Sequence, residues 1–270
     1  MNTAGRLGVG LLAAWLVACT PLDPAPPLPP AASAGDLRAQ LQRILDDHDV
    51  PGAVVLITDR ARTRHVLALG MADVARAVPM DASLPFRAGS ITKPLTAAAV
   101  LVQWHRGTLP LDVPLKDTLP VGAFHNLHER THPLTAAHLL EHTDGFDDSR
   151  PNEFLEPPGA TPTLLEVLSV NPASRVCRWA PGTGRVYGNP GYTLLGVLLE
   201  RVTGSRWEDR VTEDVMRPLG MKTATVDRDP ATWARRPVGY LGRDVPVEPR
   251  RVLHRPAGAL VATAEDVAAL

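Results

Sequence analysis

The sequence predicts an α/β protein of the α+β type, in which strands and helices occupy separate parts of the fold. Two short runs rich in β-branched residues, 52–58 and 64–70, are separated by a turn, which is the pattern of a β-hairpin. Two longer apolar segments, 91–104 and 191–204, have the length and spacing of buried helices. Because a lone hairpin is only marginally stable in water, we expect it to pack on helices or on further strands.

The composition is that of an ordinary globular protein with a sizeable core. Hydrophobic residues make up 44% of the 270 residues and charged residues 21%. The formal net charge is -1 and no basic stripe runs along the chain. We therefore expect no nucleic-acid partner. Lysine is rare and occurs only at Lys93, Lys116 and Lys222.

The first 35 residues have the pattern of an export signal followed by a tether. Residues 1–18 combine a basic start at Arg6 with an apolar stretch too short to span a bilayer comfortably. The sequence "LVAC" resembles a bacterial lipobox, so we expect cleavage before Cys19 and lipidation of its thiol; a plain signal peptide with an incidental cysteine is the alternative. Residues 19–35 are rich in proline and predict a semi-rigid spacer. The folded domain, 36–270, would then be lipid-anchored in the bacterial cell envelope, facing the periplasm or the exterior.

Capping residues mark the boundaries of the remaining helices. Asp36 is expected to cap a first helix in which apolar residues recur at helical spacing. A weaker strand candidate lies at 238–241. The other boundary signals are Gly107 after the 91–104 helix, Thr135 before and Gly145 after a short helix, Thr161 and Pro162 at a helix start, and Gly204 after the 191–204 helix.

The last segment of the sequence begins another helix. Thr263 and Asp266 form a capping-box pattern, and the sequence stops at Leu270, about two turns later. Together with the small number of predicted strands, this pattern leads us to expect a C-terminally shortened version of a longer fold. A short terminal helix that simply ends is the alternative.

Ser90 and Lys93 lie one helical turn apart at the start of the 91–104 helix. Residues three apart share a helix face. A serine in the first turn lies among unpaired backbone N–H groups at the positive end of the helix dipole, which favours an oxyanion on an attacked carbonyl. Burial lowers the pKa of a lysine, so Lys93 could take the proton of the Ser90 hydroxyl. A serine cap followed by a surface lysine explains the same residues without catalysis.

A second polar motif, Tyr187-Gly188-Asn189, follows a turn-rich segment and precedes the 191–204 helix. The Tyr187 phenol could pass a proton to a leaving group. The Asn189 amide could hold a substrate amide and orient Lys93. A tyrosine that merely packs on the following helix is the structural alternative.

These motifs together resemble the serine β-lactamase-related family, which includes class C β-lactamases, D-Ala-D-Ala carboxypeptidases and esterases. The resemblance rests on "SITK" at 90–93, on "YGN" at 187–189 and on further landmarks in the family order. It extends over residues 36–270. The landmarks are "VPGAVV", "GTLPLDVPL", "LTAAHLLEHTDGF", "RPLGMKTATV" and "PAGALVATAEDVAAL".

The resemblance implies a role for each motif residue and a fold. Ser90 would be the nucleophile that forms an acyl-enzyme, Lys93 and Tyr187 the proton-transfer pair, and Asn189 a substrate-positioning residue. It implies no metal and no other cofactor. The implied fold is β-lactamase/transpeptidase-like, with a mixed sheet and flanking helices built from both ends of the chain. A helical region from the middle of the chain would carry Ser90 and Tyr187.

One family motif, Lys-Thr-Gly or His-x-Gly on a strand lining the cleft, has no match in the sequence. Lys222 is followed by Thr223 and Ala224 and so lacks the glycine, and His254 is followed by Arg and Pro. We expect this motif, with the C-terminal strands, beyond Leu270. Loss of one oxyanion-hole donor typically lowers the rate by about two to three orders of magnitude.

Two other functions remain open from the sequence. A catalytically impaired, penicillin-binding-like lipoprotein or a fragment would retain the same motif residues. His138, Glu141 and His142 fit H-x-x-E-H, a pattern of some zinc peptidases. For the hydrolase, the substrate could be a β-lactam, a peptide ending in a D-amino acid or an ester, because fold resemblance does not select among them.

Overall fold

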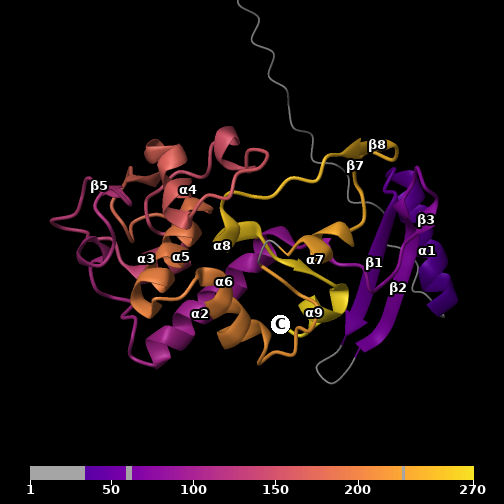
Figure 1. Cartoon of the computed structure of the whole chain (residues 1–270), viewed down its shortest axis with the longest axis horizontal. Coiled ribbons are helices and arrows are strands. Elements are labelled where there is room, and N and C mark those ends of the chain that lie inside the picture. The colour runs from indigo at the N-terminus through magenta and orange to yellow at the C-terminus, as the bar shows by residue number, and fades with distance from the viewer. Residues whose placement is uncertain (1–33, 59–62, 227–228) are drawn as a thin grey trace, which may run out of the picture.

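The computed structural model describes residues 34–58, 63–226 and 229–270. The predicted signal peptide, Cys19 and most of the predicted tether lie outside the described residues. A sheet lies at one end of the molecule and most of the helices lie at the other, as Figure 1 shows. The predicted α+β arrangement is therefore confirmed.

The sheet has three antiparallel strands in the order β1-β2-β3. β1 (Gly52–Thr58) pairs along its length with β2 (Thr63–Asp73), which confirms the predicted hairpin. β3 (Val78–Pro79) extends the sheet beyond β2. The resemblance implies a mixed sheet, whereas the strands described here are antiparallel. Among the described residues the parallel pairing is that of two short strands in the helical region.

The two ends of the described chain pack on this sheet. α1 (Ala34–Asp47) contacts β2, and α9 (Ala264–Ala268) contacts β1. α1 begins earlier than expected, so Asp36 lies within its first turn, where a carboxylate still faces the positive end of the helix dipole. The predicted capping box is present at α9, where Thr263 accepts from the backbone of Asp266 and the Asp266 side chain bonds back to Thr263.

The helical region is centred on a buried helix. α5 is buried at its first ten positions, and Gly204 ends it in the left-handed conformation that glycine favours, as the sequence predicts. The helices of this region are α2 (Thr92–His105), α3 (Ala136–Glu141), α4 (Leu164–Val170), α5 (Pro190–Thr203) and α6 (Trp207–Val211). α5 contacts the other four, so its leucines form the centre of the core.

Short elements fill the connections between these helices and strands. β7 and β8 form a second hairpin, which confirms the weaker strand candidate near 238–241. The elements are β4 (Phe86–Arg87), η1 (Gly89–Ile91), η2 (Leu115–Asp117), β5 (His125–Asn126), η3 (Pro151–Glu153), η4 (Pro172–Arg175), β6 (Val176–Cys177), η5 (Thr212–Met216), α7 (Pro230–Ala234), β7 (Gly239–Leu241), β8 (Val245–Val247), α8 (Arg255–Gly258) and β9 (Val261–Ala262).

The C-terminal segment joins the sheet to the helical region and holds the start of α2. β9 pairs with β4, so residue 261 lies opposite residue 87. The Thr92 hydroxyl accepts from the backbone N–H of Leu260 at 2.9 Å and donates to the carbonyl of Gly89 at 2.6 Å. The Thr96 hydroxyl donates to the carbonyl of Pro256 at 2.8 Å. These bonds set the position of the turn that contains Ser90.

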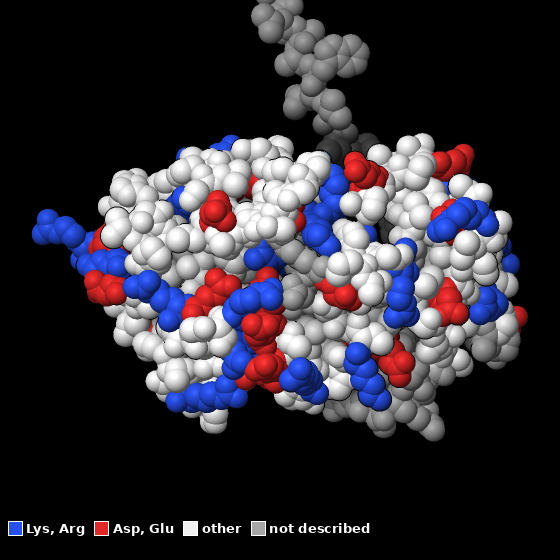
Figure 2. Space-filling model, in the orientation of Figure 1, with Lys and Arg blue, Asp and Glu red and all other residues white. Residues whose placement is uncertain are grey.

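The surface charges are mixed in sign. On the face shown in Figure 2, acidic and basic side chains are interspersed over both parts of the molecule. Within the described residues, no helix combines the length and the apolar character needed to cross a bilayer.

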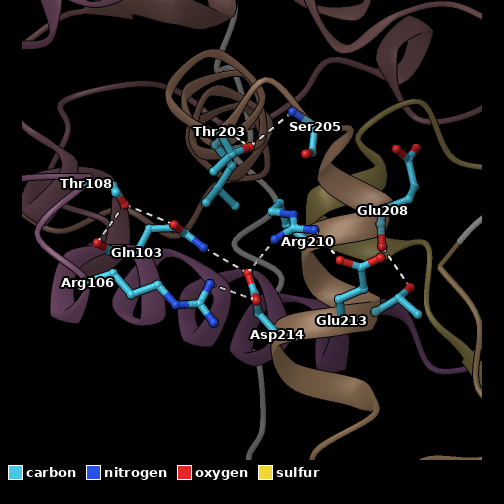
Figure 3. Close-up of polar contacts among 11 residues, drawn as sticks. Gln103, Arg106, Thr108, Thr203, Ser205, Glu208, Arg210, Glu213 and Asp214 are labelled. Atoms are coloured by element: carbon cyan, nitrogen blue, oxygen red, sulfur yellow. Dashed lines mark hydrogen bonds and ion pairs between the residues drawn. The ribbon is translucent and has the colours of Figure 1, made fainter.

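A polar network anchors the far end of α2 to the short π-helix η5. Asp214 is nearly buried and accepts hydrogen bonds from Gln103 at 2.8 Å and from Arg106 at 2.9 Å, with Arg210 at 3.5 Å (Figure 3). Glu213 pairs with the same Arg210 from the outside and is far more exposed. The side chains of Asp214 and Glu213 are 5% and 48% exposed, so the two neighbouring carboxylates differ in burial as well as in the number of their partners.

We expect Asp214→Ala to destabilise the fold by about 2 kcal/mol, because it leaves the buried Gln103 amide without its acceptor. Glu213→Ala is the matched control and should cost less than about 1 kcal/mol, since an exposed ion pair contributes little. Urea unfolding of both variants measures the difference. Equal destabilisation by the two substitutions would show that the buried network does not hold α2.

Candidate active site

Ser90 lies in the short turn η1, immediately before α2. The turn follows β4, and Gly89 takes a φ of +54°, a conformation that favours glycine, where the chain leaves the strand. The Ser90 side chain is exposed, while Lys93, one turn further on, is only 4% exposed. The hydroxyl therefore faces solvent with the amine beneath it.

The amine of Lys93 brings the predicted motif residues together. Its Nζ lies 3.3 Å from Ser90 Oγ, 2.6 Å from Tyr187 OH and 2.7 Å from Asn189 Oδ1. A fourth oxygen, the carbonyl of Ala257 on α8, lies at 3.4 Å. The four residues singled out in the sequence thus meet at one nitrogen, where α2, α5 and α8 pack together (Figure 1).

The chemistry of these four oxygens defines what a neutral Lys93 can do. The Asn189 oxygen and the Ala257 carbonyl can only accept hydrogen bonds. A neutral amine has two N–H donors and one lone pair. If the donors serve these two oxygens, the lone pair faces the two hydroxyls, Ser90 and Tyr187, and can accept a proton from either.

Burial lowers the pKa of Lys93, because the ammonium form loses hydration when it is enclosed. The hydrogen bond and charge of Tyr187 and the charge of Asp148 act in the opposite direction and raise it. The amine is therefore closer to the neutral form at working pH than a surface lysine, as a base requires.

Tyr187 and Asn189 are held by the loop that leads into α5. Asn189 is the N-cap residue of α5, and Pro190 occupies the first helical position. The backbone N–H of Gly188 donates to Nδ1 of His142 at 3.3 Å, and the His142 ring lies against the Tyr187 ring at 4.6 Å. Tyr187 is 51% exposed, so it lines the open side of the site together with Ser90.

Two contributors to the site have no motif in the sequence. Oδ1 of Asp148 accepts from the backbone N–H and from Nδ2 of Asn189, at 3.0 and 2.9 Å. Ala257 contributes only a backbone carbonyl. The sole sequence signal for Asp148 is a pair of acidic residues directly after the "HTDGF" landmark, and a backbone carbonyl leaves no signal at all.

The geometry does not support the zinc-peptidase alternative. His142 takes a left-handed φ of +60° at the end of α3, which removes it from the helix face of His138. The ring of His138 turns back to the cap residue Thr135, while that of His142 packs on Tyr187. In the part of the chain that the structure describes, no three His, Cys, Asp or Glu side chains are grouped as a metal ion would need.

The two incomplete matches to the third family motif lie elsewhere in the fold. Thr223, which follows Lys222, donates its backbone N–H and its hydroxyl to the carboxylate of Asp266 in the first turn of α9. His254 is buried, with Nδ1 at 2.8 Å from the Thr193 hydroxyl. Both segments therefore support the C-terminal region of the fold rather than Ser90.

The sequence is similar to those of known proteins over most of its length. A sequence model of the beta-lactamase family matches residues 37–270. Esterase EstB of Burkholderia gladioli is 34% identical over 216 residues, which are 74% of this chain and 54% of the esterase. Penicillin-binding protein 4 of Amycolatopsis lactamdurans is 29% identical over 230 residues, which are 82% of this chain and 58% of that protein. The chain thus spans about half the length of the curated relatives it matches.

Solved structures share the fold. EstCE1, a hydrolase with promiscuous acyltransferase activity, superposes with a TM-score of 0.73 at 22% identity, over 87% of this chain and 70% of that one. A class C beta-lactamase in complex with cefoxitin gives 0.71 at 22% identity, over 87% and 63%. The fold is therefore β-lactamase/transpeptidase-like. The family model that matches residues 37–270 shows that this chain belongs to the beta-lactamase family.

Proposed function

We propose that this chain is a serine hydrolase that cleaves an ester or amide through an acyl-enzyme on Ser90. The proposal rests on one observation: a nearly buried lysine amine contacts the exposed Ser90 hydroxyl, the Tyr187 phenol and the Asn189 oxygen at the same time. A surface lysine beside a helix cap would not be enclosed by these groups.

The contacts support a two-step reaction. Ser90 Oγ attacks the substrate carbonyl carbon while its proton passes to Nζ of Lys93. The carbonyl then reforms, the bond to the leaving oxygen or nitrogen breaks, and the leaving group takes a proton from Tyr187. Lys93, at 2.6 Å, returns a proton to the phenolate. Water then attacks the ester on Ser90, releases the acid and restores the serine proton.

The substrate class is an ester or an amide, with a β-lactam, a D-amino-acid peptide and a simple ester as its members. Relatives are named as an esterase and a penicillin-binding protein, which supports this range without narrowing it. The exposed position of Ser90 suits attack on a substrate that arrives from solvent.

The proposed location is the bacterial cell envelope, where a lipid on Cys19 would anchor the chain so that it faces the periplasm or the exterior. The support is the lipobox-like "LVAC" and the proline-rich residues that follow it.

Ser90→Ala should abolish covalent labelling of the full chain by a fluorescent penicillin or by a fluorescent, serine-reactive phosphonate. Lys93→Ala should retain the fold and slow labelling by about a hundredfold or more, because the proton acceptor is lost. Gel fluorescence over time gives the rates. Equal labelling of wild type and Ser90→Ala would refute the nucleophile, and a bound penicillin label without ester turnover would indicate a penicillin-binding protein that does not act as a hydrolase.

Tyr187→Phe should lower kcat/KM for an ester substrate by about a hundredfold, since the ring remains but the proton donor is lost. Tyr192→Phe is the control, because that buried ring also lies near Lys93, at 5.5 Å, while its hydroxyl bonds to the carbonyl of Leu140. The control should cost about 1 kcal/mol of stability and little activity. Similar kinetic losses in both variants would remove Tyr187 from proton transfer.

Cys19→Ala should prevent incorporation of labelled palmitate in a bacterial host and should leave the export signal uncleaved at this site. Electrophoretic mobility and the distribution between membrane and soluble fractions measure the effect. Unchanged palmitate incorporation would show that Cys19 is not the lipidated residue.

A further inference from the structure

We propose that Asp148 is a positioning residue, which holds the Asn189 amide with its oxygen toward Lys93 and supplies the negative charge that a Lys93 ammonium faces. The inference rests on the proposed function only in taking Lys93 as the base. Asp148 belongs to no motif of the sequence and comes from the loop after α3, 41 residues before Asn189.

The argument begins with the amide of Asn189. An amide has one donor end and one acceptor end, and rotation by 180° exchanges them. Nδ2 of Asn189 donates to the Asp148 carboxylate at 2.9 Å, while Oδ1 accepts from Lys93 Nζ at 2.7 Å. A carboxylate only accepts, so it cannot face the amide oxygen without repulsion. In the rotated amide, an NH₂ group would also meet the lysine amine.

The backbone of the site holds Asp148 in turn. The same oxygen, Oδ1, accepts from the backbone N–H of Asn189 at 3.0 Å and of Ser149 at 2.6 Å. Three donors on one oxygen suit the ionised carboxylate. Because one of these donors is the backbone of Asn189 itself, the carboxylate and the start of α5 move together.

The neighbouring acid, Asp147, has different partners. Its carboxylate pairs with Arg178 at 2.6 Å and with Arg150 at 3.2 Å. No hydrogen bond joins it to Asn189 or to Lys93 among the described residues. Adjacent positions thus hold two carboxylates of the same chemistry, of which one contacts the site.

Few charged or titratable groups face Lys93. Tyr187 and Tyr192 present their rings at 4.4 and 5.5 Å, and His142 lies behind both tyrosines. Burial lowers the pKa of His142, the positive charges of Lys93 and Arg185 lower it further, and the negative charge of Asp148 raises it. Two groups raise the pKa of Lys93, Tyr187 and Asp148, and of these two Asp148 is the one that carries a carboxylate. It opposes the effect of burial and lets the amine hold a transferred proton.

Two substitutions separate charge from orientation. Asp148→Asn keeps the size and one acceptor oxygen but removes the charge, so the amide of Asn189 can stay in place while the pKa of Lys93 falls. Asp148→Ala also removes the acceptor and allows the amide to rotate. A displacement of about 1 Å in a group that positions the reactants can slow a reaction by about a hundredfold.

The chain has only three lysines, so the charge effect can be measured directly and without substrate. In a Lys116→Arg, Lys222→Arg background, ¹³C-labelled lysine reports on Lys93 alone, and its chemical shift is followed against pH. Asp148→Asn should move the midpoint to lower pH, and Asp147→Asn should leave it in place. A midpoint that does not move in Asp148→Asn, or that moves as far in Asp147→Asn, would overturn the proposal.

A kinetic experiment keeps this inference separate from the proposed function. The rate of phosphonate labelling of Ser90 should fall at low pH, where Lys93 is protonated; this fall is the acid limb of the pH profile. In Asp148→Asn the acid limb should shift to lower pH, in step with the spectroscopic midpoint. In Asp148→Ala labelling should be about a hundredfold slower. If the midpoint shifts as expected but wild-type Ser90 is never labelled, the hydrolase function fails and the position of Asp148 stands. If Ser90 is labelled with an unshifted acid limb, the inference about Asp148 fails.

Discussion

The buried amine of Lys93 is the interaction on which the rest of the site depends. An enclosed amine needs hydrogen-bond partners, since an unsatisfied buried charge or donor is costly. Here the partners come from η1, from the loop before α5 and from α8, which are far apart in the sequence. Satisfying one nitrogen therefore requires the start of α2, the start of α5 and the C-terminal segment to be packed together.

Burial and charge oppose each other at this amine. Burial lowers the pKa of Lys93, which favours the neutral amine that a base needs, while Tyr187 and Asp148 raise it, which favours the ammonium form. A base that also returns protons needs an affinity between these extremes. In the proposed mechanism Asp148 therefore does not need to touch the substrate: its charge favours the Lys93 ammonium, and its hydrogen bond sets the orientation of the Asn189 amide.

The local features of the fold could be read from the sequence because they depend on near neighbours. The hairpin of β1 and β2, the Gly204 end of α5 and the Thr263 capping box all follow from residues within one or two turns. α1 begins at Ala34, so the expected cap residue Asp36 lies within its first turn, because the signals that set the exact end of a helix are weaker than those of its interior. Where the resemblance implied a mixed sheet, the three strands described here pair antiparallel, because consecutive strands joined by short turns run in opposite directions.

The sequence by itself determined the identities of Ser90, Lys93, Tyr187 and Asn189, through two short motifs whose spacing follows from the helix and turn that carry them. Only the tertiary structure decided that the four meet at one nitrogen, that the H-x-x-E-H residues diverge, and that Asp148 and the Ala257 carbonyl complete the site. The physical reason is that a motif records contacts along a helix or turn, whereas a hydrogen bond across 41 or 164 residues depends on how the helices pack.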